Sequence, residues 1–259
     1  MRQHHPPRAK RAALRQLEVA LLALGWAALG CEEPKKEPPK KAAAVEEAPA
    51  PAPKPLTAPI LEIDTISPKV GTERALLIHP EGKAKLAELL SGSKQWLEGK
   101  DVKVIVDRQT KVPWVVTFLD ELGKVGPSTI TIHTETRKDF SADQRFVPES
   151  KVQAPPCSVV GMVTPDYGTA VWKLSGGTAG KRTKGMAGPD LSMTGDTIER
   201  FAKGCKESTT FFVQVAEGAE WGLAFDLGAS SRKLEHAKFD ATVLLGEIPV
   251  PGHKVTLKR

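Results

Sequence analysis

The residues that could do chemistry in this chain of 259 residues are few and widely spaced. The chain holds three cysteines and, beyond residue 30, four histidines: Cys31, Cys157, Cys205, His79, His133, His236 and His253. A metal or redox site would need spacings such as Cys-x-x-Cys or His-Glu-x-x-His. None of these spacings occurs, so we expect neither a metal site nor a cofactor.

The remaining catalytic candidates are a glycine-rich loop and two acidic pairs, Asp107 with Glu121 and Asp166 with Asp190. Carboxylates where loops begin are usually solvated caps rather than acid–base partners. The loop, residues 176–183, departs from a phosphate-binding loop because Ser175 takes the first glycine position and Arg182 replaces the magnesium-binding Ser or Thr. The sequence therefore predicts no catalytic residue and a protein that is not an enzyme, with an enzyme of unknown reaction as the alternative.

Cys31 follows a segment with the order of a signal peptide. Basic residues end at Arg15 and an apolar run of about eleven residues over 19–29 precedes Gly30. That run is about half of the roughly 20 residues that span a bilayer. Residues 28–31, Ala-Leu-Gly-Cys, resemble the lipobox of bacterial lipoproteins, with Ala28 where Leu is usual. The resemblance implies cleavage before Cys31 and acylation of its thiol; the alternative is a secreted protein in which Cys31 is an ordinary thiol.

Lipidation predicts that the protein is located at the periplasmic face of a bacterial membrane. Several acyl chains on one cysteine hold a protein firmly to a bilayer, and Glu32, rather than Asp, after Cys31 favours the outer membrane. Five of the 37 basic and one of the 31 acidic residues lie in residues 1–30, so cleavage would reduce the net charge from +6 to about +2. This small remainder disfavours nucleic acid as a partner.

The other two thiols, Cys157 and Cys205, would then lie in an oxidising compartment. They are candidates for one disulfide, which would stabilise the fold by roughly 4 kcal/mol on the chain-entropy model. Two buried thiols that serve as small apolar side chains are the alternative.

Residues 31–59 have the composition of a tether. From Glu32 to Pro59 the chain has eight Pro, seven Ala, five Lys and five Glu, and almost nothing that could enter a core. Proline-rich sequence stays extended at about 3.1 Å per residue, so the tether could reach roughly 85 Å from the lipid.

Residues 60–136 alternate strand and helix patterns. We expect a strand over 60–66, a short strand over 75–78, a helix from Pro80 to Gly99 with a break near Gly92, a strand over 102–106, a helix from Pro113 and a strand over 129–134. Trp114, Phe118 and Leu122, four apart, give the second helix an apolar stripe that Gly123 or Gly126 would end. This order predicts an α+β fold with helices on one face of a sheet.

The same pattern returns in residues 157–246. Residues 67–72 have a counterpart at 164–169, 97 positions later, and Trp114 has one in Trp221, 107 positions later. A net insertion of ten residues would explain the difference. Residues 137–156 would connect the two copies, and residues 247–259 would form a C-terminal tail.

Both copies carry a motif that resembles a known family. One such motif consists of residues 102–107, a loop, Trp114 and the helix through Gly123. It resembles the periplasmic domain of the ExbD/TolR biopolymer-transport family. In that family a strand ends in an Asp, as here in Asp107, and a helix that begins with an aromatic residue follows. Glu217, Trp221 and residues 225–228 resemble a second, diverged copy. The loop after Asp107 is longer, and that after Glu217 shorter, than in the family. The resemblance implies two tandem modules, each a mixed sheet with helices on one face.

The resemblance also implies a role. Proton conduction in the family requires a transmembrane helix with a buried Asp, whereas the only acidic residue near the apolar run here is Glu18, so we expect no proton conduction. Without that helix, only the periplasmic domain of the family is represented here. It implies a non-catalytic binding or regulatory module whose partner is an envelope protein complex or the cell wall. The two copies could pair as an intramolecular pseudo-dimer. A structural lipoprotein that binds the cell wall is a further alternative.

Overall fold

The computed structural model describes residues 57–136, 138–205, 207, 210–235 and 237–258. The chain from Lys54 to Arg259 forms one compact unit. The predicted signal peptide, Cys31 and nearly all of the predicted tether lie outside the described residues. Within the described ranges, no helix has both the length and the apolar character needed to cross a membrane.

The described residues form five α-helices and one short 3₁₀ helix: α1 Gly82–Gly92, α2 Lys94–Leu97, α3 Val112–Val125, α4 Leu191–Ala202, α5 Trp221–Ser231 and η1 Glu149–Lys151. They also form thirteen strands: β1 Leu61–Ile63, β2 Pro68–Val70, β3 Glu73–Arg74, β4 Asp101–Val106, β5 Thr129–His133, β6 Asp143–Phe146, β7 Val159–Val163, β8 Thr169–Lys173, β9 Gly180–Arg182, β10 Lys184–Gly185, β11 Gly188–Pro189, β12 Thr210–Val215 and β13 Ala241–Leu244.

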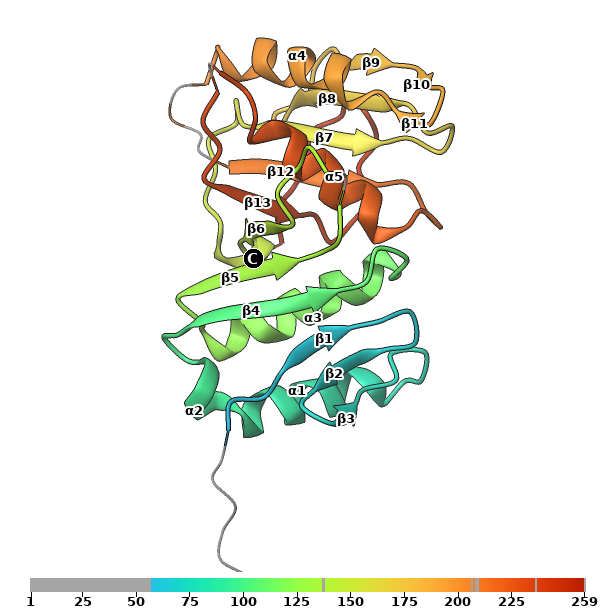
Figure 1. Ribbon diagram of the computed structural model, residues 1–259. Helices are drawn as coiled ribbons and strands as arrows, with labels where there is room; N and C mark the ends of the chain where they lie inside the picture. The colour runs from blue at the N-terminus through green and yellow to red at the C-terminus, as the bar shows by residue number, and fades with distance from the viewer. Residues whose placement is uncertain (1–56, 137, 206, 208–209, 236, 259) are drawn as a thin grey trace, which may run out of the picture. The chain divides into compact units, whose positions relative to one another are not determined.

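Eleven of these strands make one mixed sheet in the order β3-β2-β1-β4-β5-β6-β13-β12-β7-β8-β9, and β10 and β11 pair separately (Figure 1). The fold is therefore mixed α/β. Parallel neighbours such as β4 and β5 are joined through helices, whereas the antiparallel pairs β1–β2 and β7–β8 are hairpins.

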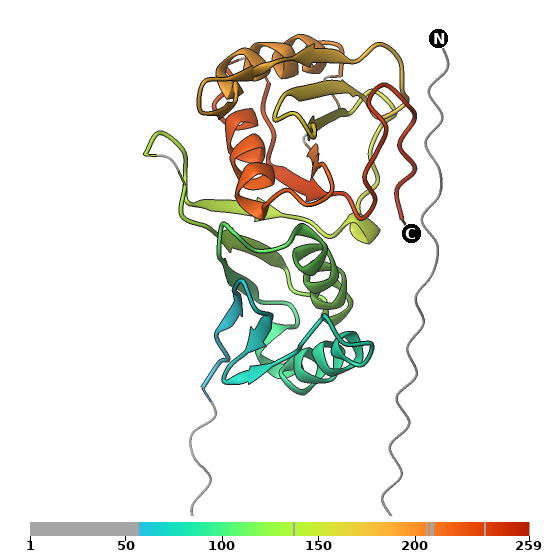
Figure 2. The same cartoon turned by 90° about the vertical axis from the view of Figure 1, so that its right-hand side faces the viewer.

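The sheet consists of two halves with the same strand order. In the N-terminal half, residues 57–136, the order from edge to centre is β3-β2-β1-β4-β5, and in the C-terminal half, residues 157–258, it is β9-β8-β7-β12-β13. Each half runs hairpin, helix, strand, helix, strand along the chain. The side view in Figure 2 shows α1 and α3 gathered on one side of the strands of their half. The internal repetition expected from the sequence is thus present as a repetition of topology.

The stretch between the halves, residues 137–156, contributes the central strand. β6 pairs antiparallel with β5 and parallel with β13, so it joins the two halves into one sheet. The short 3₁₀ helix η1 follows it, and Pro148 packs so close to α3 that a Cβ on Gly123 would lie 2.8 Å from its ring. Residues 137–156 are therefore built into the fold as well as connecting the halves.

The core of the N-terminal half is formed by one face of its strands and one stripe of a helix. β4 alternates exposed and buried residues, with Val102, Val104 and Val106 buried. Trp114, Phe118 and Leu122 of α3 are buried as one stripe against the strands. Gly126 ends α3 with φ 84°, a left-handed conformation that glycine adopts without strain. One face of this part of the sheet thus packs on helices and the other keeps charged side chains such as Lys103.

The C-terminal half is covered on both faces, and its strands lack alternation for that reason. β7 and β13 are buried at every position. Helices α4 and α5 cover one face, while the predicted C-terminal tail covers the other, with Val255 and Leu257 packed beside buried Trp172. The backbone N–H of Val255 donates to the carbonyl oxygen of Leu174 at 2.9 Å, and the indole N–H of Trp172 donates to that of His253 at 2.9 Å.

One expected strand is wrong. Residues 75–78 form a turn in which the N–H of His79 donates to the carbonyl oxygen of Leu76 at 3.0 Å. Gly82 packs on that turn so closely that a Cβ would lie 2.1 Å from the oxygen of Leu76. The strands that complete the edge are instead β2 and β3, within residues 68–74. The strand expected over 60–66 is also shorter, because Ile66 is exposed in the hairpin turn.

Candidate functional site

The four motif residues expected from the sequence lie around the junction of the two halves. Asp107 is exposed just beyond β4, and its carboxylate accepts a hydrogen bond from the N–H of Gln109 at 2.7 Å, which fixes the turn. Trp114 is buried, with the ammonium of Lys111 5.1 Å from the centre of its ring. Glu217 is exposed in the turn that leads into α5. The structure thus gives Asp107 and Trp114 local structural roles.

Trp221 is fully buried at the start of α5. Its ring lies 5.4 Å from that of Phe146 and 5.7 Å from that of Phe225, and its indole N–H donates to the hydroxyl of Thr134 at 2.8 Å. Thr134 belongs to the N-terminal half and Phe146 to β6, so Trp221 packs α5 against the centre of the sheet.

Backbone hydrogen bonds show which residues of the two halves correspond. The N–H of Asp107 donates to Ile63 at 2.9 Å, and that of Ala216 donates to Val163 at 2.8 Å. Thr110 then donates back to Asp107, and Ala219 to Ala216, both at 3.1 Å. The turns after β4 and β12 therefore correspond at a spacing of 109 residues.

These backbone hydrogen bonds correct two pairings made from the sequence, Trp114 with Trp221 and residues 67–72 with residues 164–169. Residue for residue, Val112 rather than Trp114 corresponds to Trp221, and Glu217 corresponds to Arg108. In the first hairpins, Asp64 donates to Ser67 where Thr164 donates to Gly168, so residues 67–72 do not match 164–169 at a spacing of 97. Aromatic identity at Trp114 and Trp221 concealed the two-residue shift.

The two turns pair with each other across the junction. Lys111 and Glu220, which correspond in the two halves, form an isolated antiparallel bridge. The N–H of Trp221 donates to the carbonyl oxygen of Thr110 at 2.9 Å, and that of Gly222 donates to that of Arg108 at 2.8 Å. The start of α5 is therefore held by the turn after β4.

On one side of this junction an ion pair fills the space between a turn and a helix. Both guanidinium nitrogens of Arg108 donate to the carboxylate of Asp226 on α5, at 3.0 and 2.8 Å. The hydroxyl of Thr136 donates to the same carboxylate at 2.6 Å, and Arg108 also donates to the carbonyl oxygen of Glu135 at 2.8 Å. The Asp226 side chain is 4% exposed. The hydrogen bond with Asp226 raises the pKa of Arg108, so this group stays charged.

Glycine at position 222 makes room for this ion pair. A Cβ there would lie 3.0 Å from three atoms of the Arg108 guanidinium. The corresponding residue of the N-terminal half, by the 109-residue spacing, is Pro113, and the residue that corresponds to Asp226 is Thr117. The other side of the junction is therefore built from different side chains.

There the space is an open cavity of about 380 Å³ between α3 and the turn after β12. Its wall includes Thr117 and Asp120 from α3, Glu217 and Gly218 from the turn, and Ile248 and Lys258 from the tail. We call this space the junction cavity. Its lining combines apolar side chains such as Val116 and Ile248 with a few polar ones, as small binding sites do.

Asp120 is the ionisable group most perturbed by this surrounding. It is half-buried, and among the described residues it accepts no hydrogen bond and makes no ion pair. Burial raises the pKa of its carboxyl above the usual value, even though the charges of Lys258 and Lys83 lower it. The folded chain therefore disfavours the ionised form of Asp120 relative to a fully solvated carboxyl.

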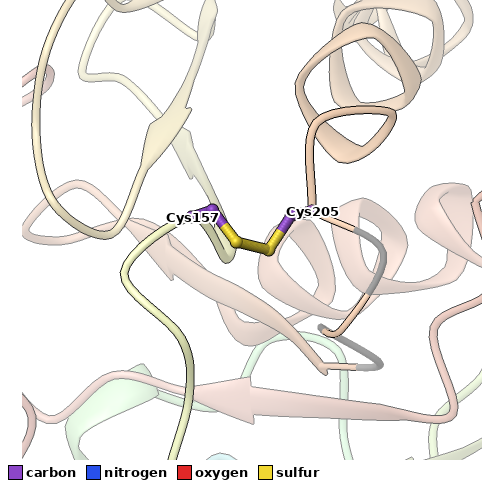
Figure 3. Close-up of a disulfide and its surroundings, with 2 residues drawn as sticks. All are labelled: Cys157 and Cys205. Carbon is purple, nitrogen blue, oxygen red and sulfur yellow. A yellow bond between two sulfur atoms is a disulfide. The ribbon is translucent and has the colours of Figure 1, made fainter.

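The remaining two cysteines form a disulfide (Figure 3). Cys157 and Cys205 are joined with their Cα atoms 5.4 Å apart, 48 residues apart in the chain. The bond links the segment before β7 to the end of α4. The structure therefore has the disulfide, and not the two separate buried thiols that the sequence left open as the alternative.

The acidic pairs considered as catalytic have structural partners. Asp190 caps α4 by accepting from the N–H of Met193 at 3.1 Å, and Glu121 is buried against the ammonium of Lys124 at 2.7 Å. Asp166 accepts from the hydroxyl of Thr164, which lowers its pKa.

The ring Nδ1 of His133 lies 2.8 Å from the carboxylate of Asp143 on the neighbouring strand. The hydrogen bond with His133 lowers the pKa of Asp143. Within the described ranges, no group of three or more His, Cys, Asp or Glu side chains comes close enough to hold a metal ion.

The sequence did not reveal the Arg108–Asp226 pair or the junction cavity. A partial signal existed, since Asp226 stands between Phe225 and Leu227 and is the one charged residue of α5, where a buried carboxylate needs a partner. Nothing in the sequence indicates that Arg108 is that partner.

Comparison with known proteins gave no match: no family model, no curated protein and no solved structure matches the chain.

Proposed function

We propose that this chain is a non-catalytic lipoprotein of the bacterial periplasm, a binding or regulatory module associated with envelope biopolymer transport that conducts no protons. Cys31 carries the lipid, residues 31–59 hold the globular part away from the membrane, and the two halves are diverged ExbD/TolR-like modules that pair within one chain. The outer membrane is the favoured location.

The observation that carries this proposal is the repeated topology. Both halves contain the strand, turn, helix and strand on which the resemblance rests: β4, α3 and β5 in one, and β12, α5 and β13 in the other. The bridge pairs Lys111 of one turn with Glu220, its counterpart in the other turn. Equivalent residues meet in the same way across the two-fold axis of a dimer. One chain would thus supply the paired arrangement that separate subunits otherwise form.

A binding role also agrees with the surroundings of the candidate groups. The carboxylates considered as acid–base partners cap helices, close turns or pair with lysines, so they are used for structure. The junction cavity, in contrast, offers polar groups without partners among the described residues, which suits recognition of a side chain or small group.

Proximity labelling in native envelopes tests the proposal. A peroxidase fused after residue 259 of the full chain should label proteins of an envelope transport complex or material of the cell wall. The matched control is the same enzyme fused after residue 59, which shares the predicted signal, lipid and tether but lacks both modules. If the two fusions label the same neighbours to the same extent, the modules bind nothing specific and the proposal is wrong.

A further inference from the structure

A second cavity lies between the loop that joins β8 to β9 and the last turn of α4, which are neighbours in Figure 1. Its volume is about 380 Å³. Two positively charged side chains line it, Lys173 at the end of β8 and Arg200 in α4, and none of its lining residues is acidic. We call this space the loop cavity. Its charge differs from that of the junction cavity, where lysines and carboxylates both occur.

The charged ends of these two side chains converge on the space between strand and helix. A Cβ on Gly180 of β9 would lie 3.2 Å from a guanidinium nitrogen of Arg200. A Cβ on Gly204, just after α4, would lie 3.9 Å from the ammonium nitrogen of Lys173. Arg200 thus reaches from the helix to the edge strand, and Lys173 reaches from its strand to the end of the helix.

Neither charged group has an anionic partner within the described ranges. Lys173 and Arg200 make no hydrogen bond and no ion pair there, and the neighbouring carboxylate of Glu199 does not line the cavity. The backbone carbonyl oxygens of Glu199, Phe201 and Ala202 already accept hydrogen bonds from the N–H groups that follow α4. Two positive charges therefore share a small space without a counter-charge, which favours an anion beside them.

The C-terminal tail holds the loop in place, so the cavity is formed without a ligand. The N–H of Gly177 donates to the carbonyl oxygen of Gly252 at 2.8 Å, and a Cβ on Gly176 would lie 2.8 Å from the backbone nitrogen of Lys254. Thr178, the next residue of the loop, donates no hydrogen bond in the part of the chain that the structure describes. Its N–H and hydroxyl groups can therefore donate to a ligand.

The loop does not act as the phosphate-binding loop of a nucleotide site. Lys181, which takes the lysine position of that motif, does not line the cavity. Arg182 donates to the hydroxyl of Thr197 at 3.0 Å. The positive charge of the cavity comes instead from Lys173 and Arg200, which lie outside the motif.

We infer that the loop cavity binds a phosphate group, with Lys173 and Arg200 as its charged partners and Thr178 as a further donor. A phosphate monoester carries a charge of about −1.5 to −2 at pH 7 and three strong acceptor oxygens, which suits two cations and a neutral donor. A carboxylate has one charge and two oxygens. Arginine and lysine both bind phosphate well.

The phosphate group belongs either to a small phosphorylated molecule or to the headgroup of a lipid. The shared chemistry is the phosphate monoester. This ligand goes beyond the proposed function and does not depend on it.

Titration with inorganic phosphate tests the cavity directly. The full chain in detergent is titrated at constant ionic strength, adjusted with sodium chloride, and the backbone amide signals of Thr178, Gly180 and Arg200 are followed by NMR. Acetate is the control anion, because it carries a single charge on two oxygens. We expect phosphate to shift these signals saturably, at concentrations at least roughly tenfold lower than acetate.

Two variants locate the binding. Lys173→Gln and Arg200→Gln should each weaken phosphate binding by roughly tenfold, because each removes a charged hydrogen-bond donor. Lys181→Gln is the matched control, since it removes the same charge from the neighbouring strand outside the cavity, and should leave binding unchanged. Because Lys173 and Arg200 have no ion-pair partner within the described ranges, both cavity variants should unfold at the temperature of the natural chain. Lost binding would then not reflect lost folding.

A short-chain lipid distinguishes the two sources. Dihexanoyl phosphatidic acid carries a phosphate monoester on a lipid, and dihexanoyl phosphatidylcholine, which has no net charge, is its control. Phosphatidic acid that shifts the same signals at roughly tenfold lower concentrations than inorganic phosphate would identify a lipid headgroup. Shifts only at equal or higher concentrations would identify a small phosphorylated molecule.

The variants decide the inference. Saturable phosphate binding that both cavity variants weaken and Lys181→Gln does not supports it. The absence of a saturable shift, equal binding of acetate, or unchanged binding by either cavity variant overturns it. The proximity-labelling experiment makes no use of this cavity, so failure of the proposed function and failure of the phosphate site can be told apart.

Discussion

The guanidinium group of Arg108, in the turn after β4, holds both carboxylate oxygens of Asp226 on α5, 118 residues further along the chain. The carboxylate is almost completely buried, whereas the guanidinium group remains about one-third exposed. This pair therefore joins the two halves, and removal of either side chain would leave the charge of the other unsatisfied.

Arg108→Ala should lower the free energy of unfolding by about 2 to 3 kcal/mol, because it leaves the Asp226 carboxylate buried with only Thr136 as a side-chain partner. Urea unfolding followed by circular dichroism measures this. Lys94→Ala is the matched control, since it removes an exposed ion pair with Glu98, and should change stability by at most about 0.5 kcal/mol. Equal effects of the two variants would show that the pair does not hold the halves together.

Reducing the disulfide should lower the free energy of unfolding by about 4 kcal/mol, because the unfolded chain regains the freedom of a loop of 48 residues. The double variant Cys157→Ser, Cys205→Ser should unfold like the reduced natural chain and should not respond to reductant. Thermal unfolding with and without dithiothreitol measures both effects. A natural chain insensitive to reductant, with two thiols that react with an alkylating agent, would contradict this.

Two glycines should respond to alanine in opposite directions. At Gly161, in β7, a Cβ would lie 2.6 Å from the ring of Phe211, so Gly161→Ala should destabilise the fold by about 1 to 3 kcal/mol. At Gly92, the last residue of α1, nothing lies within 4 Å of a Cβ, so Gly92→Ala should stabilise it by about 0.5 to 1 kcal/mol. Urea unfolding of both variants measures the difference, and the same sign for both would count against the packing described.

Asp64 should make part of the stability depend on acid pH. Its hydrogen bonds with Arg74 hold the pKa of the carboxyl well below its usual 3.8. A lowered folded-state pKa means that ionised Asp64 stabilises the fold above about pH 4, and that this contribution is lost as the pH falls toward the lowered value.

Asp64→Asn should therefore be less stable than the natural chain by about 1 kcal/mol at pH 7, and the difference should shrink steadily below pH 4. Arg74→Gln should show the same pH dependence, because it removes the largest cause of the shift. Urea unfolding at several pH values measures it. A difference that stays constant from pH 7 to pH 2 would contradict the assigned cause.

The sequence predicted the elements whose pattern is local. β4 was predictable because residues 102–106 are rich in β-branched side chains, and α3 because Pro113, the stripe from Trp114 to Leu122 and Gly126 mark its start, buried face and end. The C-terminal half was harder to read, since β12 is buried on both faces and does not alternate.

Features that depend on distant residues could not be predicted. β6, Asp143–Phe146, has a composition typical of a linker, and only its neighbours β5 and β13 make it a strand. The turn at residues 75–78 is apolar enough for a strand, but its close contact with Gly82 fixes another conformation. The junction cavity arises from side chains of α3, the turn after β12 and the C-terminal tail, which only the fold brings together.

Intact-mass analysis of the chain purified from native membranes tests most directly the claim on which the proposed function depends, that a lipid on Cys31 is its attachment to the bilayer. The predicted species begins at Cys31 and carries acyl groups on that residue. A species that still contains residues 1–30 with an unmodified Cys31 would contradict the anchor, the absence of proton conduction and the role proposed here.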